Sequence, residues 1–546
     1  MRKKALSVLL AAAMATSLTA CGNTENKTTT AATSENSSGT EEPQPVEHVE
    51  VTYPIVEEPT TVKGLVVSPD TTYSEDRLVW QKVEEVTGIN IEWEFIDQEA
   101  LSTYLASNDW PDFFHVKFTS GVLNDYGVLG GRFANIYDYL QYMPNLQQTF
   151  EDYPAAKAAA TEVNGEMYEL MTVEKSATTV GSNRPYVRTD VLEKAGVTMP
   201  TTVDEFYQAL VDLKEFYGEA SYVPDLKQNE YWTPILFGAF GTEVEMAYDN
   251  DENGKVYTNY TSDQMKKYLE FMNKLYEEGL IHQEFLTLDN TVRLDLAKSG
   301  NVAFIGGAEG NNLQAADFED GEFHLDCGVP LTSEYDNTQT LAGVAGVGGG
   351  SRIVINAESD YVKEICQMMD IMYATEEVVE GSGLYGTSFC YGMEGTDWDF
   401  GPEGSGTYTF HTPESYDGSF TVYQYGEVIW QNLGRVDALE GLVTDTVSNN
   451  RARQQGFVKN VLPYMEEDYF PLTLLKFNED EQYVLDNRLA DIDSYVQSMK
   501  GKFITGAADI ETEWETYCNT LNDMGLQEVI EVYQSAYDRW VAAVAE

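Results

Sequence analysis

The order of apolar and polar side chains along residues 60–95 predicts a strand, a helix and a second strand. Residues 60–68 form a mostly apolar run that is typical of a buried strand. Residues 73–88 place their apolar side chains on one helical face, and Gly88 ends that helix. Residues 89–95 alternate apolar with polar side chains, which indicates a strand with one buried face. This order opens an α/β domain with a largely parallel sheet.

Further signals continue this pattern along the chain. Residues 105–118 predict a helix end, a turn marked by Pro and an apolar strand, and residues 163–170 predict a hairpin with a Gly turn. Thr202 and Glu205 have the spacing of a capping box at the start of a helix. Ser262 caps another helix in the same way. Residues 509–546 have the apolar periodicity of helices.

The first 61 residues differ in composition from the rest. Residues 1–20 have a basic start, a short apolar stretch and small residues at the end, as in a secretory signal peptide. The four letters LTAC, ending at Cys21, resemble the bacterial lipobox. That resemblance implies a lipid-modified (palmitate-bearing) Cys21 that holds the protein on the extracellular face of the cell membrane. The alternative is an ordinary signal peptide with an incidental cysteine. Residues 21–61 are polar, and we expect a disordered tether there.

Charge and cysteine content exclude several classes of function. The formal net charge is −58, which argues against nucleic acid or an anionic membrane surface as the ligand of the folded body. The five His and the five Cys show no metal-type spacing, so a zinc enzyme is not expected. Cys366 and Cys390 allow a disulfide that the sequence alone does not decide.

One short stretch has the start of a calcium-loop pattern. Asp249, Asp251 and Asn253, followed by Gly254, match D-x-D-x-N-G. The position for the bidentate Glu holds Tyr260, and no flanking EF-hand helices are evident. The competing interpretation is an acidic hairpin turn without metal, and no cofactor is expected otherwise.

Several blocks in order resemble one family. The stretch RPYVRTDVLEKAGVTMPTTVDEFYQAL, which begins at Arg184, is similar to a signature of extracellular solute-binding proteins of ABC importers, of the sugar-binding type. The stretches YLEFMNKLYEEGLIHQEF (268–285) and LAKSGNVAFIGG (296–307) are similar to later blocks of that family. Residues 503–540 resemble the C-terminal block of a long Gram-positive subgroup.

The resemblance implies a two-lobe periplasmic-binding-protein-like fold of type II, with a ligand cleft between lobes joined by a hinge. By analogy, lobe one takes 62–183 plus 341–390, and lobe two takes 184–340 plus 391–546. The expected partners are a small solute and the transmembrane permease subunits, and we expect a monomer attached to the membrane through the lipid anchor only.

Candidate ligand residues come from segments that follow strands or lie near lobe crossings. Tyr and Trp rings match the flat C–H faces of sugars, while charged and amide groups bond the hydroxyls. The candidates are Tyr73, Lys117, Arg184, Tyr186, Trp232, Glu309, Asn311, Trp398 and Trp430. For Trp80 and Trp430 a place in the core is an equal alternative, and we expect Arg188 and Asp190 to form a structural ion pair.

The leading hypothesis is therefore a binding protein, not an enzyme, that captures a carbohydrate, an oligosaccharide in particular, for a permease. A binding protein for a peptide or another non-sugar solute on the same fold is the alternative. A surface glycoside hydrolase would need two carboxylates flanking a bond, and among 91 acidic residues no motif selects such a pair.

Overall fold

The computed structural model describes most of the chain from residue 49 onward. The described residues are 49–67, 78–107, 109–174, 185–224, 236, 238–241, 248–298, 301–305, 324–337, 341–342, 346–411, 434–436, 438–439, 442–444, 449–466 and 470–545. Among them, no helix has the length and the apolar character that a membrane crossing needs. Cys21, the predicted signal and residues 21–48 of the predicted tether lie outside these residues. The end of the predicted tether, residues 49–61, is described and is not disordered: Tyr53, Ile55 and Val56 pack against the core of the large sheet, and β1 begins at Thr60.

A six-stranded sheet is built mainly from the first third of the chain. Its strand order is β14-β4-β11-β3-β1-β2, and all strands run parallel except β11, which pairs antiparallel with both neighbours. The bounds are β1 Thr60–Val67, β2 Ile89–Ile96, β3 Phe113–His115, β4 Glu169–Glu174, β11 Val347–Ile355 and β14 Arg435–Val436. The predicted strand–helix–strand opening is confirmed, because α1 (Leu78–Thr87) joins β1 to the parallel β2.

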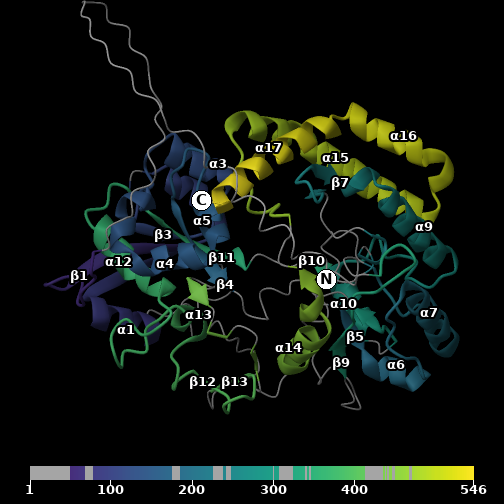
Figure 1. The fold of residues 1–546 in the computed structure, drawn as a ribbon, viewed down its shortest axis with the longest axis horizontal. Coiled ribbons are helices and arrows are strands. Elements are labelled where there is room, and N and C mark those ends of the chain that lie inside the picture. The colour runs from purple at the N-terminus through teal and green to yellow at the C-terminus, as the bar shows by residue number, and fades with distance from the viewer. Residues whose placement is uncertain are drawn as a thin grey trace, which may run out of the picture. The chain divides into compact units, whose positions relative to one another are not determined.

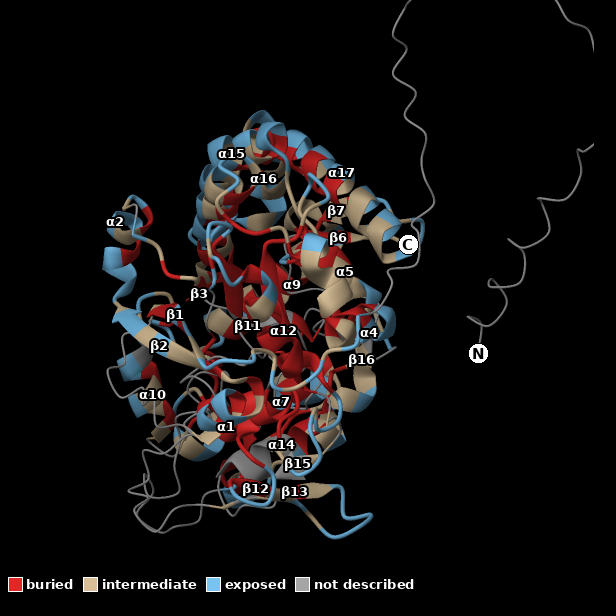
Figure 2. Ribbon diagram, turned by 90° about the vertical axis from the view of Figure 1, so that its left-hand side faces the viewer, coloured by how far each residue is buried: buried red, intermediate tan, exposed pale blue. Residues whose placement is uncertain are grey.

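Helices cover both faces of this sheet, and Figure 1 shows α1, α4 and α12, which share one face, beside its strands. Adjacent residues of β3 divide the two faces: Phe113 packs in one core and Phe114 in the other. The first core contains apolar residues of α1, α4 (Pro144–Asp152), α5 (Pro154–Ala160) and α12 (Val362–Asp370). The second contains residues of α2 (Leu101–Leu105) and of a π-helix, Leu123–Val128. In Figure 2 β11 and α12 are largely buried, whereas β2 at the sheet edge is not.

A further hydrophobic core, distinct from the two on the faces of the large sheet, lies around a three-stranded sheet. In that sheet β5 (Tyr186–Arg188) lies between β8 (Phe304–Ile305) and β9 (Leu325–Cys327), antiparallel to both. Helices supply most of the core, and they include residues such as Phe206, Leu269 and Val529, all fully buried. Their bounds are α6 Thr189–Ala195, α7 Val203–Tyr217, α9 Asp263–Glu277, α15 Glu479–Thr505, α16 Ile510–Asp523 and α17 Leu526–Ala545.

Smaller elements complete the described part. They are α3 Ser120–Val122, α10 Asn290–Lys298, α13 Ser388–Tyr391, α14 Asn449–Asn460, β6 Tyr248–Asn250, β7 Val256–Thr258, β10 Leu341–Ala342, β12 Trp398–Phe400, β13 Thr407–Phe410, β15 Val443–Thr444 and β16 Met465–Glu466. Two contacts bear on the segment that follows the expected lobe boundary at residue 390. β14 pairs with β4 of the large sheet, and Trp398 and Leu439 share a core cluster with Tyr385.

Both predicted capping residues, Thr202 and Ser262, cap their helices, but only half of the predicted capping box at Thr202 forms. The Thr202 hydroxyl accepts from Glu205 N at 3.1 Å and caps α7. The Glu205 carboxylate does not return to Thr202; it accepts from the N–H and the hydroxyl of Thr201. Ser262 caps α9 by accepting from Met265 N. Cys366 and Cys390 are both buried free thiols, so the disulfide that their sequence allowed is absent.

Candidate functional site

Lys117 lies at the edge of the large sheet where a ligand is expected. Because β1, β3 and β4 are parallel, their carboxyl ends meet at one edge, the usual ligand edge of such sheets. Lys117 follows β3 by two residues and is exposed. Val116 N donates to Arg352 O at 3.0 Å, which fixes the start of this segment on β11.

Lys117 belongs to a charged group that we call the edge cluster: Lys117, Glu162, Glu169, Arg352 and Lys476. Arg352 Nε lies 3.6 Å from Glu169 Oε2, and both side chains are buried. Burial raises the pKa of Glu169, although Arg352 and Lys476 oppose the rise. Loss of water around the amine, and then repulsion from Arg352, lower the pKa of Lys117. The cluster therefore combines hydrogen-bond donors with carboxylate acceptors.

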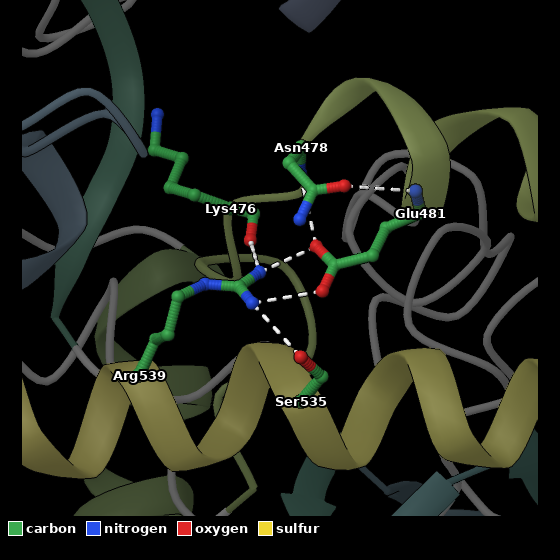
Figure 3. Close-up of polar contacts among 5 residues, drawn as sticks. All are labelled: Lys476, Asn478, Glu481, Ser535 and Arg539. Carbon is green, nitrogen blue, oxygen red and sulfur yellow. Dashed lines mark hydrogen bonds and ion pairs between the residues drawn. The ribbon is translucent and has the colours of Figure 1, made fainter.

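The C-terminal helices are tied to this cluster, as Figure 3 shows. Arg539 of α17 donates to both carboxylate oxygens of Glu481, at 2.8 and 2.5 Å, and to the Lys476 carbonyl at 2.9 Å. Asn478 and Glu481 form a capping box at the start of α15. The Lys476 amine binds Glu162 at 2.5 Å.

Apolar contacts support the same connection. Leu474 is part of the core of the large sheet, and Trp540 packs against both that core and the core of the three-stranded sheet. α17 also packs against α5, whose sequence is PAAKAAA. Small side chains allow this close helix approach. The C-terminal helices are thus attached to both cores.

The other described candidates are packing residues in this structure. Tyr186 of β5 and Trp398 of β12 are both 0 % exposed, so neither presents a ring face to a ligand here. Trp398 Nε1 donates to Gly392 O at 3.1 Å, which satisfies its only polar atom. Trp80 is likewise in the core of the large sheet. Arg188 and Asp190 form the expected structural ion pair, with Nη2 to Oδ2 at 2.5 Å.

The remaining candidates lie outside the described residues and stay predictions. They are Tyr73, Arg184, Trp232, Glu309, Asn311 and Trp430. The described strand ends show where two of these segments leave the sheet: Tyr186 pairs with Ile305, and Pro185 O accepts from Gly328 N at 2.8 Å. Because β5 and β8 are antiparallel, the start of β5 and the end of β8 lie at the same end of this sheet.

The calcium-like stretch forms the hairpin of the competing interpretation. Asp251 Oδ1 accepts from the N–H groups of Asn253 and Lys255, and β6 pairs with β7 around this turn. The Asp249 carboxylate accepts from Asn250 N and from the Tyr257 hydroxyl. These bonds satisfy the carboxylates without a cation. Within the described ranges, no group of three or more His, Cys, Asp or Glu could hold a metal ion.

Sequence reasoning missed most of the edge cluster. Glu169 and Arg352 are far apart in the chain, and nothing local in either stretch indicates the other. The Asn478–Glu481 capping box did have a local signal, because Asn followed three residues later by Glu precedes an apolar run.

Comparisons with known proteins agree with this architecture. The family model described as bacterial extracellular solute-binding protein matches residues 31–379, and a domain of unknown function, DUF3502, matches residues 473–542. The fructooligosaccharide ABC transporter substrate-binding protein FusA of Streptococcus pneumoniae is 24% identical over 518 residues, covering 90% of this chain and 92% of FusA.

Two solved structures show the same fold. One is FusA of S. pneumoniae in complex with kestose, with a TM-score of 0.65 and 22% identity, covering 88% of this chain and 99% of that chain. The other is an HMO-binding solute-binding protein from Bifidobacterium longum infantis, with a TM-score of 0.68 and 20% identity, covering 89% and 99%. The fold is the two-lobe type II fold, and the chain belongs to the bacterial extracellular solute-binding protein family.

Proposed function

We propose that this protein binds an oligosaccharide between its lobes, outside the cell, and delivers it to the permease of an ABC importer. One observation carries the proposal. The alignment with FusA, whose name gives a fructooligosaccharide as its ligand, runs along 90% of this chain and 92% of that protein. A match along the whole length includes both lobes, and therefore all the segments that would surround a ligand.

The chemistry of the chain is consistent with a sugar ligand. Aromatic residues are 12% of the chain, and 35 of them are Tyr, whose ring packs on a sugar while its hydroxyl bonds to it. The edge cluster adds donors and acceptors, and its Lys117 lies at the carboxyl edge of the large sheet. We infer that Lys117 is the ligand contact among its residues, since it is exposed while Glu169 and Arg352 are buried.

The proposal assigns no catalysis and no cofactor to the chain. Binding and lobe closure are the whole of its work, as in other binding proteins of this architecture. It also places the protein on the extracellular face of the membrane, held by a lipid on Cys21. We further assign lobe one to residues 62–183 plus 341 to about 439, which extends the sequence-based boundary so that β14 and the Trp398 cluster stay with their sheet.

Thermal unfolding of the purified protein against matched panels of oligosaccharides and peptides tests the ligand class. A ligand that binds only the folded protein stabilises it by about 2.7 kcal/mol at 100 times its Kd. We expect a rise in Tm with one class of oligosaccharide and recovery of that sugar intact. A rise with peptides alone would replace the sugar by another solute, and cleaved sugar would make the protein an enzyme.

Metabolic labelling with radioactive palmitate tests the anchor separately. We expect label in the membrane fraction of the native protein and none in Cys21→Ser. Cys518→Ser, which changes a cysteine of α16, is the matched control and should keep the label. Equal labelling of native protein and Cys21→Ser would contradict the anchor assignment.

A further inference from the structure

A pocket lies on the large sheet at the edge opposite Lys117. Its lining includes residues 127–131, Asn135, Asp138, Glu166 and Ala357. Ala357 follows the carboxyl end of β11, and Glu166 precedes β4. Because β11 is antiparallel to its neighbours, both positions lie at the amino ends of β3 and β4. The pocket therefore lies at the opposite edge from Lys117, although Glu162 of the edge cluster donates its N–H to the Glu166 carbonyl at 2.8 Å.

The backbone around the pocket is held in a specific shape. The π-helix Leu123–Val128 forms one side, and such helices occur often at functional sites. Gly127 packs on the ring of Tyr168, where an added Cβ would lie 3.0 Å from a ring carbon. At Gly130 an added Cβ would lie 2.6 Å from Asp125 O. A larger residue at either position would have to displace these atoms, so the local backbone shape depends on glycine.

The polar groups of the pocket are arranged in advance. Glu166 accepts from the Tyr168 hydroxyl, and Asn164 Nδ2 donates to Glu166 Oε2 at 2.8 Å. Asn135 Oδ1 accepts from the N–H groups of Tyr137 and Met167, at 3.2 and 3.1 Å. These bonds fix the Asn135 amide and one oxygen of Glu166. Asn135, Asp138 and Glu166 all line the pocket.

This set of groups selects one class of ligand. The pocket has a volume of about 440 Å³, within the range of roughly 300–1,000 Å³ of ligand sites. Two carboxylates and no Lys or Arg line it, so an anion would be repelled. Carboxylate acceptors, an amide donor and the half-buried Tyr139 suit a neutral polyhydroxy ring, while Tyr168 is buried behind Gly127 and shapes the floor.

We propose that this pocket is a second carbohydrate site on lobe one, which takes a single neutral sugar unit. The inference rests on the proposed function for the choice of sugar as its ligand, but it uses none of the residues of the inter-lobe site.

Hydrogen–deuterium exchange with mass spectrometry separates the two sites. The purified protein is compared without sugar and with fructose, glucose, galactose or kestose at saturating concentrations. Peptides covering residues 123–139, which contain no residue of the edge cluster, report on the pocket, and peptides containing Lys117 or β5 report on the inter-lobe site. We expect slower exchange in the pocket peptides with at least one monosaccharide.

Three variants identify the cause of any protection. Asp138→Asn with Glu166→Gln removes the charged acceptors, and Ala357→Trp fills the pocket from an exposed position without touching the polar network. The double variant and Ala357→Trp should each weaken sugar binding at the pocket at least tenfold, as measured by protection of the pocket peptides. Protection of the inter-lobe peptides should stay unchanged. Glu151→Gln, an exposed carboxylate of α4, is the control and should behave as the native protein.

Each result decides between the two proposals. Protection of the inter-lobe peptides alone would overturn the second site and leave the proposed function standing. Protection of the pocket peptides alone would support the second site and count against the proposed function. No protection by any sugar would overturn the second site, and so would pocket protection that survives both the double variant and Ala357→Trp. Protection by Ca²⁺ alone would replace the sugar by a cation.

Discussion

Replacing Arg352 by Met tests the electrostatics of the edge cluster. Arg352 and Glu169 are 4% and 7% exposed, so the substitution leaves a carboxylate buried beside an apolar side chain. Breaking a buried ion pair by removing one partner costs roughly 3–5 kcal/mol. Here the distance is 3.6 Å, and Lys117 and Lys476 still act on Glu169. We therefore expect Arg352→Met to lower the unfolding free energy by about 3 kcal/mol at pH 7.

The loss should depend on pH in a defined direction. The pKa of Glu169 is already above its ordinary value in the folded protein, and without Arg352 it rises further. Between the unfolded and the folded pKa, the folded state binds the extra proton, so stability falls as pH increases through that window. Each pH unit of acidification within the window therefore recovers up to about 1.4 kcal/mol.

Urea unfolding followed by tryptophan fluorescence measures this effect. Trp80 and Trp93 pack around the large sheet and report on its unfolding. Arg488→Met is the matched control, since it removes an ion pair with Glu528 that is closer, at 3.1 Å, but exposed. Such surface pairs contribute about 0–1 kcal/mol. A cost for Arg352→Met equal to that of the control, or a cost that does not shrink from pH 7 to pH 5, would refute the reasoning.

Three further predictions concern other parts of the fold. Asn478→Ala removes the capping box of α15 and should cost about 1 kcal/mol in unfolding free energy, measured by urea unfolding. Lys476→Met breaks the half-buried ion pair with Glu162 and should make the segment around residue 476 more sensitive to limited proteolysis, with the chain still folded by circular dichroism. Burial raises the pKa of Asp370 to about 7, so between about pH 4 and pH 7 its contribution makes stability fall as pH rises. Asp370→Asn should flatten that part of the stability–pH curve.

Each of these has its own contrary result. Asn478→Ser keeps an N-cap oxygen, so a loss as large as that of Asn478→Ala would show that the cap is not the cause. Unchanged proteolysis of Lys476→Met would mean that packing of Leu474 and Trp540 alone holds the segment. An unaltered pH slope in Asp370→Asn would exclude Asp370 as the titrating group.

Local structure in this protein follows from local sequence. The first strand and helix, the stop at Gly88 and the caps at Thr202 and Ser262 each depend on residues within a few positions of one another. Their physical causes, an apolar period or a side-chain acceptor at a helix start, are visible in the sequence. The parallel β1–β2 pair also follows, because a helix between two short strands leaves little choice of direction.

Contacts between segments that are far apart in the chain could not be predicted from the sequence. β14 joins the large sheet beside β4, although the two strands are far apart in the chain, and a two-residue strand carries no periodicity. Tyr186 and Trp398 were chosen as ligand contacts for their ring chemistry, but the same rings fill cores equally well. Only the packing of neighbouring elements decides between these roles. For Lys117 the position in the chain is more informative than the residue type, because residues that follow the carboxyl end of a parallel strand lie at the usual ligand edge of such a sheet.

Calorimetric titration of the purified protein with oligosaccharides, followed by chromatography of the recovered sugar, tests the central claim most directly. The account predicts saturable binding of at least one oligosaccharide, weakened by Lys117→Met, with the sugar recovered intact. Absence of heat with every oligosaccharide, in protein that binds a peptide or another solute in the same assay, would contradict it.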